Sequence, residues 1–84
     1  MDIRERLAFN LKRLRKEKGL SQEQFAFESQ IHRTYISDLE RGARNPTIEI
    51  VEKLAAALGV VEGELFLNFP SNTNNPTIKT REVS

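Results

Sequence analysis

Cysteine is absent from the 84-residue sequence. This absence excludes a disulfide framework, thiolate metal sites and cysteine nucleophiles, and it fits a reducing cytosol. The only histidine, His32, has no cluster of ligand-type residues near it in the sequence. We therefore expect neither a metal nor another cofactor.

Long apolar runs are also missing, since none approaches the ~20 residues that span a bilayer, and no signal-peptide core is visible. We expect a cytoplasmic protein without a membrane partner. No stretch alternates as a strand does, and no internal repeat is visible, which favours an all-α domain. The sequence also lacks a nucleophile–base pair, paired catalytic carboxylates and a phosphate-binding glycine loop, so we do not expect an enzyme.

The net charge is only +1, but it is unevenly distributed along the chain. Residues 1–45 carry ten Lys and Arg against seven Asp and Glu, whereas residues 46–84 carry three against five. Such polarity is expected if one side of the protein meets phosphate groups. A solvated charged surface would give the same distribution, so charge alone does not decide between them.

Hydrophobic spacing predicts five helices. Ile3, Leu7, Leu11 and Leu14 form the stripe of the first helix, which should end near Lys18 before a glycine. The second should begin with a capping box in which Ser21 is the N-cap and Gln24 its partner, and should bury Phe25 and Ala26. The third should direct three apolar side chains inward: Tyr35, Ile36 and Leu39.

The sequence Asn45-Pro46-Thr47 marks a boundary, and Thr47 is a suitable N-cap for a fourth helix that ends at Gly59. Its apolar stripe comprises Ile48, Val51, Leu54, Ala55 and Leu58. Glu62 to Leu67 should form a short fifth helix, weakened by a glycine. Residues 1–69 would then make one domain, and the polar residues 70–84 a disordered tail.

Two short helices joined by a tight turn, with a polar outer face on the second, are typical of a helix-turn-helix that enters the DNA major groove. We place this motif at about residues 21–41. Arg33, Thr34, Ser37 and Asp38 would share the outward face and contact base edges. For Asp38, a carboxylate close to phosphates, the favoured role is to hold Arg33 or Arg41 in place.

The segments Gly19–Ala26 and Arg33–Gly42 resemble the phage repressor/Cro helix-turn-helix family, also called the XRE family. Arg33 to Ser37, together with Arg44 and Asn45, most resembles controller proteins of restriction-modification systems. The resemblance implies a compact five-helix bundle of the lambda-repressor-like type. It also implies that Gln30 stands at a left-handed turn position where the family usually has glycine.

Further roles follow from the resemblance. Gln22, Arg44 and Asn45 would contact DNA phosphates, and Arg15 and Glu40 would form a partly buried ion pair. For Tyr35 the residue spacing alone leaves two alternatives, a position in the core and a contact of its hydroxyl with a phosphate.

The residues also suggest a homodimer. Four large apolar side chains crowd one short segment, and a six-residue helix cannot bury them all: Leu65, Phe66, Leu67 and Phe69. Some of them are therefore expected at a subunit interface. The resulting hypothesis is a homodimeric transcriptional regulator that binds a palindromic or pseudo-palindromic operator, with RNA polymerase as a possible further partner. The alternative is a protein-interaction module, such as an antitoxin or coactivator with the same fold.

Overall fold

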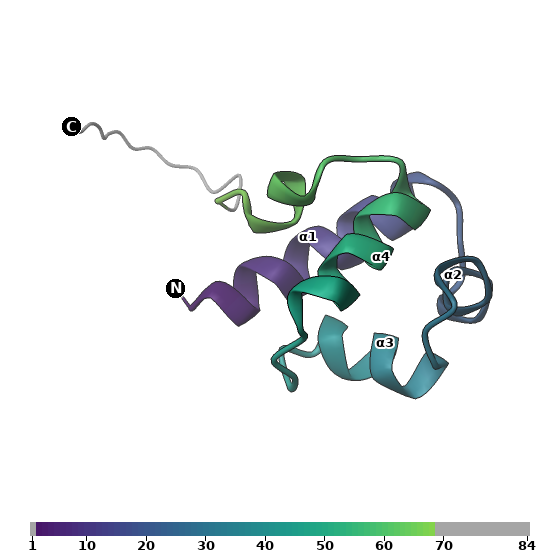
Figure 1. Cartoon of the computed structure of the whole chain (residues 1–84), viewed down its shortest axis with the longest axis horizontal. Helices are drawn as coiled ribbons and strands as arrows, with labels where there is room; N and C mark the ends of the chain where they lie inside the picture. The colour runs from purple at the N-terminus through teal and green to yellow at the C-terminus, as the bar shows by residue number, and fades with distance from the viewer. Residues whose placement is uncertain (1, 69–84) are drawn as a thin grey trace.

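The computed structural model describes residues 2–68, which fold into four α-helices and one 3₁₀ helix (Figure 1). No strand occurs among these residues, which agrees with the predicted all-α class. Phe69 and the predicted tail at 70–84 lie outside the described residues. In chain order the helices are α1 (Ile3–Glu17), α2 (Gln22–Ser29), α3 (Arg33–Glu40), α4 (Ile48–Leu58) and the 3₁₀ helix η1 (Glu62–Phe66).

The predicted fifth helix at Glu62 to Leu67 is corrected, because this segment forms a five-residue 3₁₀ helix that ends at Phe66 and residues 2–68 contain four α-helices. Its N-cap, Val61, has no side chain that can accept a backbone hydrogen bond, and none forms. A segment this short, with Gly63 inside it, gains little from α-helical hydrogen bonding, and 3₁₀ geometry suits such single turns.

Side-chain caps fix where α2 and α4 begin. The Ser21 hydroxyl accepts from the Gln24 amide at 3.0 Å, and the Gln24 side chain accepts from the Ser21 amide at 2.8 Å. The Thr47 hydroxyl accepts from the Ile50 amide at 3.2 Å. Both predicted N-caps are confirmed. Helix α4 ends at Gly59 as predicted, because the backbone of this glycine is left-handed and closes the helix.

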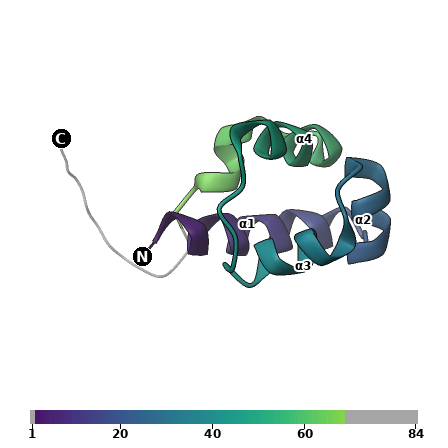
Figure 2. The same ribbon diagram turned by 60° about the horizontal axis from the view of Figure 1, so that its bottom comes forward.

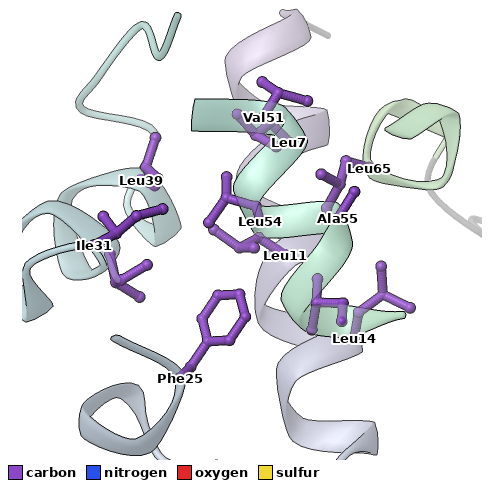
Figure 3. Packing of buried hydrophobic residues seen from close by; sticks show 12 residues of the cluster. Leu7, Leu11, Leu14, Phe25, Ile31, Leu39, Val51, Leu54, Ala55 and Leu65 are labelled. Atoms are coloured by element: carbon purple, nitrogen blue, oxygen red, sulfur yellow. The ribbon is translucent and has the colours of Figure 1, made fainter. Parts of the chain in front are cut away.

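The core lies where the inner faces of the four α-helices and η1 converge (Figure 3). Phe25 of α2, Leu11 of α1 and Leu54 of α4 are fully buried in it. The other buried apolar members are Leu7, Leu14, Ile31, Ile36, Leu39, Val51, Ala55, Leu58 and Leu65. Such close packing of aliphatic side chains is the main source of stability in a domain of this size.

Ile3 and Ile48 were predicted to belong to the buried stripes of their helices, and the structure corrects both. They are 54% and 82% exposed. Each stands in the first turn of its helix, and both border the same surface pocket rather than the core.

The helices are arranged so that α3 is left accessible on one side. Helix α1 packs against α3 and η1, while α2 packs against both α3 and α4. In both views α3 lies at the lower edge of the molecule, away from η1 (Figures 1 and 2). Helix α4 runs along the opposite side from α3 in Figure 2.

Candidate nucleic-acid interface

The turn between α2 and α3 sets the angle at which α3 is presented. Gln30 caps α2 in a left-handed conformation with φ of 62°, as predicted for this position. The next residue, Ile31, is buried, and its amide donates to the Ala26 carbonyl at 3.1 Å. The buried Ile31 therefore anchors this turn to the core, and α3 begins two residues later at Arg33.

Helix α3 has two distinct faces. Ile36 and Leu39 are buried and Tyr35 is half-buried against the core, in agreement with the predicted inward set. Arg33 and Thr34 are exposed at the first turn. Ser37 and Asp38 follow one turn later and are partly exposed. The four predicted base-reading residues thus lie on the part of α3 that the core does not cover.

Asp38 joins two arginines that follow α3. One carboxylate oxygen accepts from the Arg41 Nη2, and the other from the Arg44 Nε at 3.3 Å. The predicted hold on Arg41 is found, whereas the alternative partner, Arg33, makes no hydrogen bond or ion pair with any residue in 2–68. The contact with Arg44 was not predicted, because the loop that returns Arg44 to α3 has no sequence periodicity.

Arg44 also lies over an aromatic ring. Its guanidinium carbon is 4.5 Å from the centroid of the Tyr35 ring, within the range of a cation–π interaction. Tyr35, predicted either as core or as a phosphate ligand, therefore supports Arg44 while its inner side contacts the core. Asn45, the next predicted phosphate contact, is exposed.

The predicted ion pair between Arg15 and Glu40 is present and almost wholly buried. The Arg15 Nε and Nη2 donate to the two Glu40 oxygens at 2.6 and 3.0 Å, and the two side chains are only 9% and 4% exposed. Arg15 Nη1 also donates to the Leu20 carbonyl at 2.7 Å. The paired charges therefore connect α1, the loop before α2, and α3.

Gln22 joins this network. Its amide nitrogen donates to Glu40 Oε1 at 3.1 Å, so the side chain at the start of α2 is tied to the end of α3. Its predicted contact with a DNA phosphate stays a prediction, but the position is suitable, because helix N-termini attract anions.

Two residues that the sequence did not single out hold η1 in place. Asn10 is buried, and its amide donates to the carbonyls of Leu65 (3.2 Å) and Leu67 (2.8 Å). The Arg6 Nε donates to the Phe66 carbonyl at 3.2 Å. An asparagine and an arginine within α1 carry no sequence signal for such long-range contacts.

The dimer-interface candidates separate into different environments. Leu65 is fully buried in the chain's own core, so its place among the interface candidates is corrected. The 3₁₀ helix directs the Leu65 side chain into the core, while the Leu65 carbonyl accepts a hydrogen bond from Asn10 of α1. Phe66 is partly buried and Leu67 is exposed, and Phe69 is outside the described residues.

Residues 2–68 contain no group of three or more metal-ligating side chains and no helix long and apolar enough to cross a membrane. The arrangement that stands out is instead the polar outer face of α3, with Arg33 at the start of the helix and Arg41 and Arg44 beyond its end.

Comparison with known proteins identifies the motif. The sequence model of a helix-turn-helix family of transcriptional regulators matches residues 11–65, well over half of the chain and the whole of α2, the turn and α3. The chain belongs to this family. The resemblance to phage-repressor-type regulators is thereby confirmed.

Relatives of this helix-turn-helix protein include restriction-modification controllers. Control protein C.MunI of Mycoplasma is 48% identical over 66 residues, which is 77% of this chain and 89% of that protein. The crystal structure of the controller C.AhdI from Aeromonas hydrophila has a TM-score of 0.73 and 43% identity, covering 75% of this chain and 96% of that one. The controller C.Esp1396I, solved as a tetramer with its natural 35 base-pair operator, has a TM-score of 0.71 and 38% identity, covering 79% and 87%.

Proposed function

We propose that this protein is a sequence-specific regulator that binds a palindromic or pseudo-palindromic operator as a homodimer and controls a restriction-modification operon. The observation that carries the proposal is α3 itself. Its inward face is fixed by the core, while Arg33 and Thr34 at its exposed start are available to a major groove. The similarity of this chain to the controller C.Esp1396I, which was solved in complex with its operator, supports the proposal.

Different residues of the interface would supply affinity and specificity. Arg33, Thr34, Ser37 and Asp38 lie on the face of α3 that would approach base edges. Gln22, Tyr35, Arg44 and Asn45 flank that face at the start of α2, on α3 and in the loop after it, where phosphates would run. Phosphate contacts would give most of the affinity, which would fall steeply with salt.

Selection of duplexes from a random pool tests the proposal directly. The purified protein should enrich one sequence family with two-fold symmetry, its half-sites about one helical turn (~34 Å) apart. The same sequence should lie upstream of adjacent restriction and modification genes. If no sequence is enriched and random duplexes bind weakly, the rival interpretation of a protein-interaction module is favoured instead.

Arg33→Ala tests base reading by Arg33, the single cation of α3. On the selected site the change should cost about 1–3 kcal/mol in a fluorescence-anisotropy titration and relax the preference at one base pair. Binding to random duplexes should weaken less. An equal loss on both kinds of DNA would mean that Arg33 contacts phosphate only.

The homodimer rests on an apolar surface that the single chain leaves uncovered, which we call the α1–α4 patch. It consists of Ile3, Ile48 and Phe66, which line one pocket, and of the exposed Leu67, which follows Phe66 in the chain. Leu7, Pro46 and Val51 line the same pocket. Exposed apolar side chains that cluster in this way mark interaction sites more often than isolated ones do.

A further inference from the structure

One carboxylate on α3 gathers two cations that belong to the loop after it. Asp38 contacts Arg41 and Arg44, and its own side chain is only 20% exposed, whereas those of the two arginines are 65% and 47% exposed. The backbone strengthens the arrangement, because the Ala43 amide donates to the Asp38 carbonyl at 2.9 Å. The loop is therefore folded around Asp38 by both its main chain and its side chains.

The geometry leaves the outer end of Arg44 available. Asp38 binds the Nε, which is the inner nitrogen of the guanidinium group, and the ring of Tyr35 supports the plane. The terminal Nη1 and Nη2 make no hydrogen bond with any residue in 2–68. An arginine fixed in this way presents two parallel donors, which match a phosphate or a guanine edge.

Charge alone would make Asp38 unfavourable in a DNA-binding surface. A carboxylate near phosphates is repelled by them, and removing it should strengthen binding to any duplex. Fixing two long arginine side chains, however, costs rotamer entropy. In a preformed arrangement the side chains are ordered on folding, so DNA binding does not add this cost. Repulsion lowers affinity for every duplex, whereas the preformed arrangement raises affinity only for a duplex whose phosphates or bases meet the fixed guanidinium groups.

We propose that Asp38 is a specificity-determining positioning residue, which holds Arg41 and Arg44 in the arrangement that suits the cognate duplex while it lowers affinity for DNA in general. This proposal rests on the proposed function, because it requires a preferred sequence. The relevant quantity is the ratio of cognate to random affinity, since a purely structural role would leave that ratio unchanged.

Asp38→Asn should lower this ratio roughly tenfold, the size expected when one fixed contact in a specific interface is lost. Random duplexes should bind the variant more tightly, and cognate duplexes should bind it no more tightly than they bind the parent. Both affinities are measured by anisotropy titration over a series of salt concentrations. Glu52→Gln is the matched control, since it makes the same charge change at an exposed position of α4 and should leave the ratio unaltered.

Arg44→Lys tests the same arrangement without altering α3. Lysine keeps the charge but has no Nε to meet Asp38 and no plane to lie over Tyr35, so the ratio should again fall while random binding stays nearly constant. In the Arg44→Lys background, Asp38→Asn should lower the ratio by less than it does alone.

Each of the following results overturns the proposal. One is an equal rise in cognate and random affinity for Asp38→Asn, which would mean that the carboxylate acts only through its charge. Another is an unchanged ratio for Arg44→Lys. If random-pool selection enriches no sequence at all, the proposed function fails and this inference fails with it. An enriched site with an unaltered ratio overturns the inference alone.

Discussion

Gln30 occupies a backbone conformation that glycine adopts without steric cost. Its φ of 62° is left-handed, and it is the only non-glycine residue in 2–68 with a positive φ. The left-handed region costs an ordinary residue roughly 1–2 kcal/mol, because Cβ approaches a backbone oxygen. The turn before α3 is nevertheless maintained, since Ile31 is buried on one side and α3 is packed on the other.

Gln30→Gly should therefore stabilise the protein by about 0.5–1 kcal/mol, the relief of strain being partly offset by the greater entropy of glycine in the unfolded chain. In a domain of this size, 1 kcal/mol corresponds to roughly 4–8 °C in melting temperature. Gln30→Ala is the control, since it retains Cβ and should give no gain. A melting temperature that does not rise for glycine, or that rises equally for alanine, would show that this backbone is not strained.

Single residues differ in how far the sequence could specify them. The left-handed Gln30 and the pairing of Arg15 with Glu40 came from the family resemblance, and both are found. The contacts of Asn10 with η1 and of Arg44 with Tyr35 could not be predicted. The first joins residues 55 positions apart, and the second depends on how the loop after α3 folds back onto the helix, which no spacing rule fixes.

At the scale of elements, helix α1 begins with a cap that ionises. Asp2 accepts from the Arg4 amide at 2.7 Å and pairs with the Arg4 guanidinium at 3.1 Å, and Glu5 completes the capping box. The hydrogen bond from the Arg4 side chain, then that from its amide, lowers the pKa of Asp2 below its ordinary value. The ionised form of Asp2 is therefore the one that favours the folded state.

The contribution of Asp2 should be lost in acid. Because the folded-state pKa is the lower one, its contribution to the free energy of unfolding is complete above the unfolded pKa, about 3.9, and disappears as pH falls through the folded value. Urea unfolding between pH 6 and pH 2 should show this loss. Asp2→Asn keeps a capping side chain without a titrating group, so its stability should fall less over that interval. Equal acid sensitivity in both proteins would contradict the assignment.

Elements with a complete local signal were predicted well. The caps at Ser21 and Thr47 and the glycine after α4 each act within one turn, so their hydrogen bonds are implied by residues three or four positions apart. The segment Glu62–Phe66 has no side-chain cap, and side chains of α1 donate hydrogen bonds to its Leu65 and Phe66 carbonyls. Its position against α1 therefore depended on tertiary contacts that no local signal predicts.

At the scale of the whole molecule, the α1–α4 patch is formed by the first turns of α1 and α4 and by residues 66–67, and none of its residues belongs to α3. Asn45 and Pro46, which line the pocket beside the patch, follow directly after Arg44. A partner subunit bound at the patch would fix the relative position of two α3 helices, because the loop after α3 leads directly into the pocket. The sequence predicted an excess of apolar residues at 65–69, but it missed Ile3 and Ile48, because their spacing fits a buried stripe equally well.

Ile48→Glu should separate the proposed dimer without unfolding the chain. The side chain is 82% exposed, and a negative charge in the first turn of α4 is favourable to that helix. Dimerisation, measured by sedimentation equilibrium, should be lost. Affinity for the two-fold operator should fall by about 10²–10⁴, the usual gain when two linked half-sites bind together, while one half-site should bind the variant as it binds the parent.

Val61→Glu provides the matched control, since Val61 is 69% exposed, stands before η1 and lies outside the α1–α4 patch. It introduces the same charge and should leave both dimerisation and operator binding intact. A dimer that persists in Ile48→Glu would place the subunit interface elsewhere on the molecule. Loss of operator binding in a variant that stays dimeric would instead mean that Ile48 acts on the loop that carries Arg44. Pro46, two residues after Arg44, lines the same pocket as Ile48.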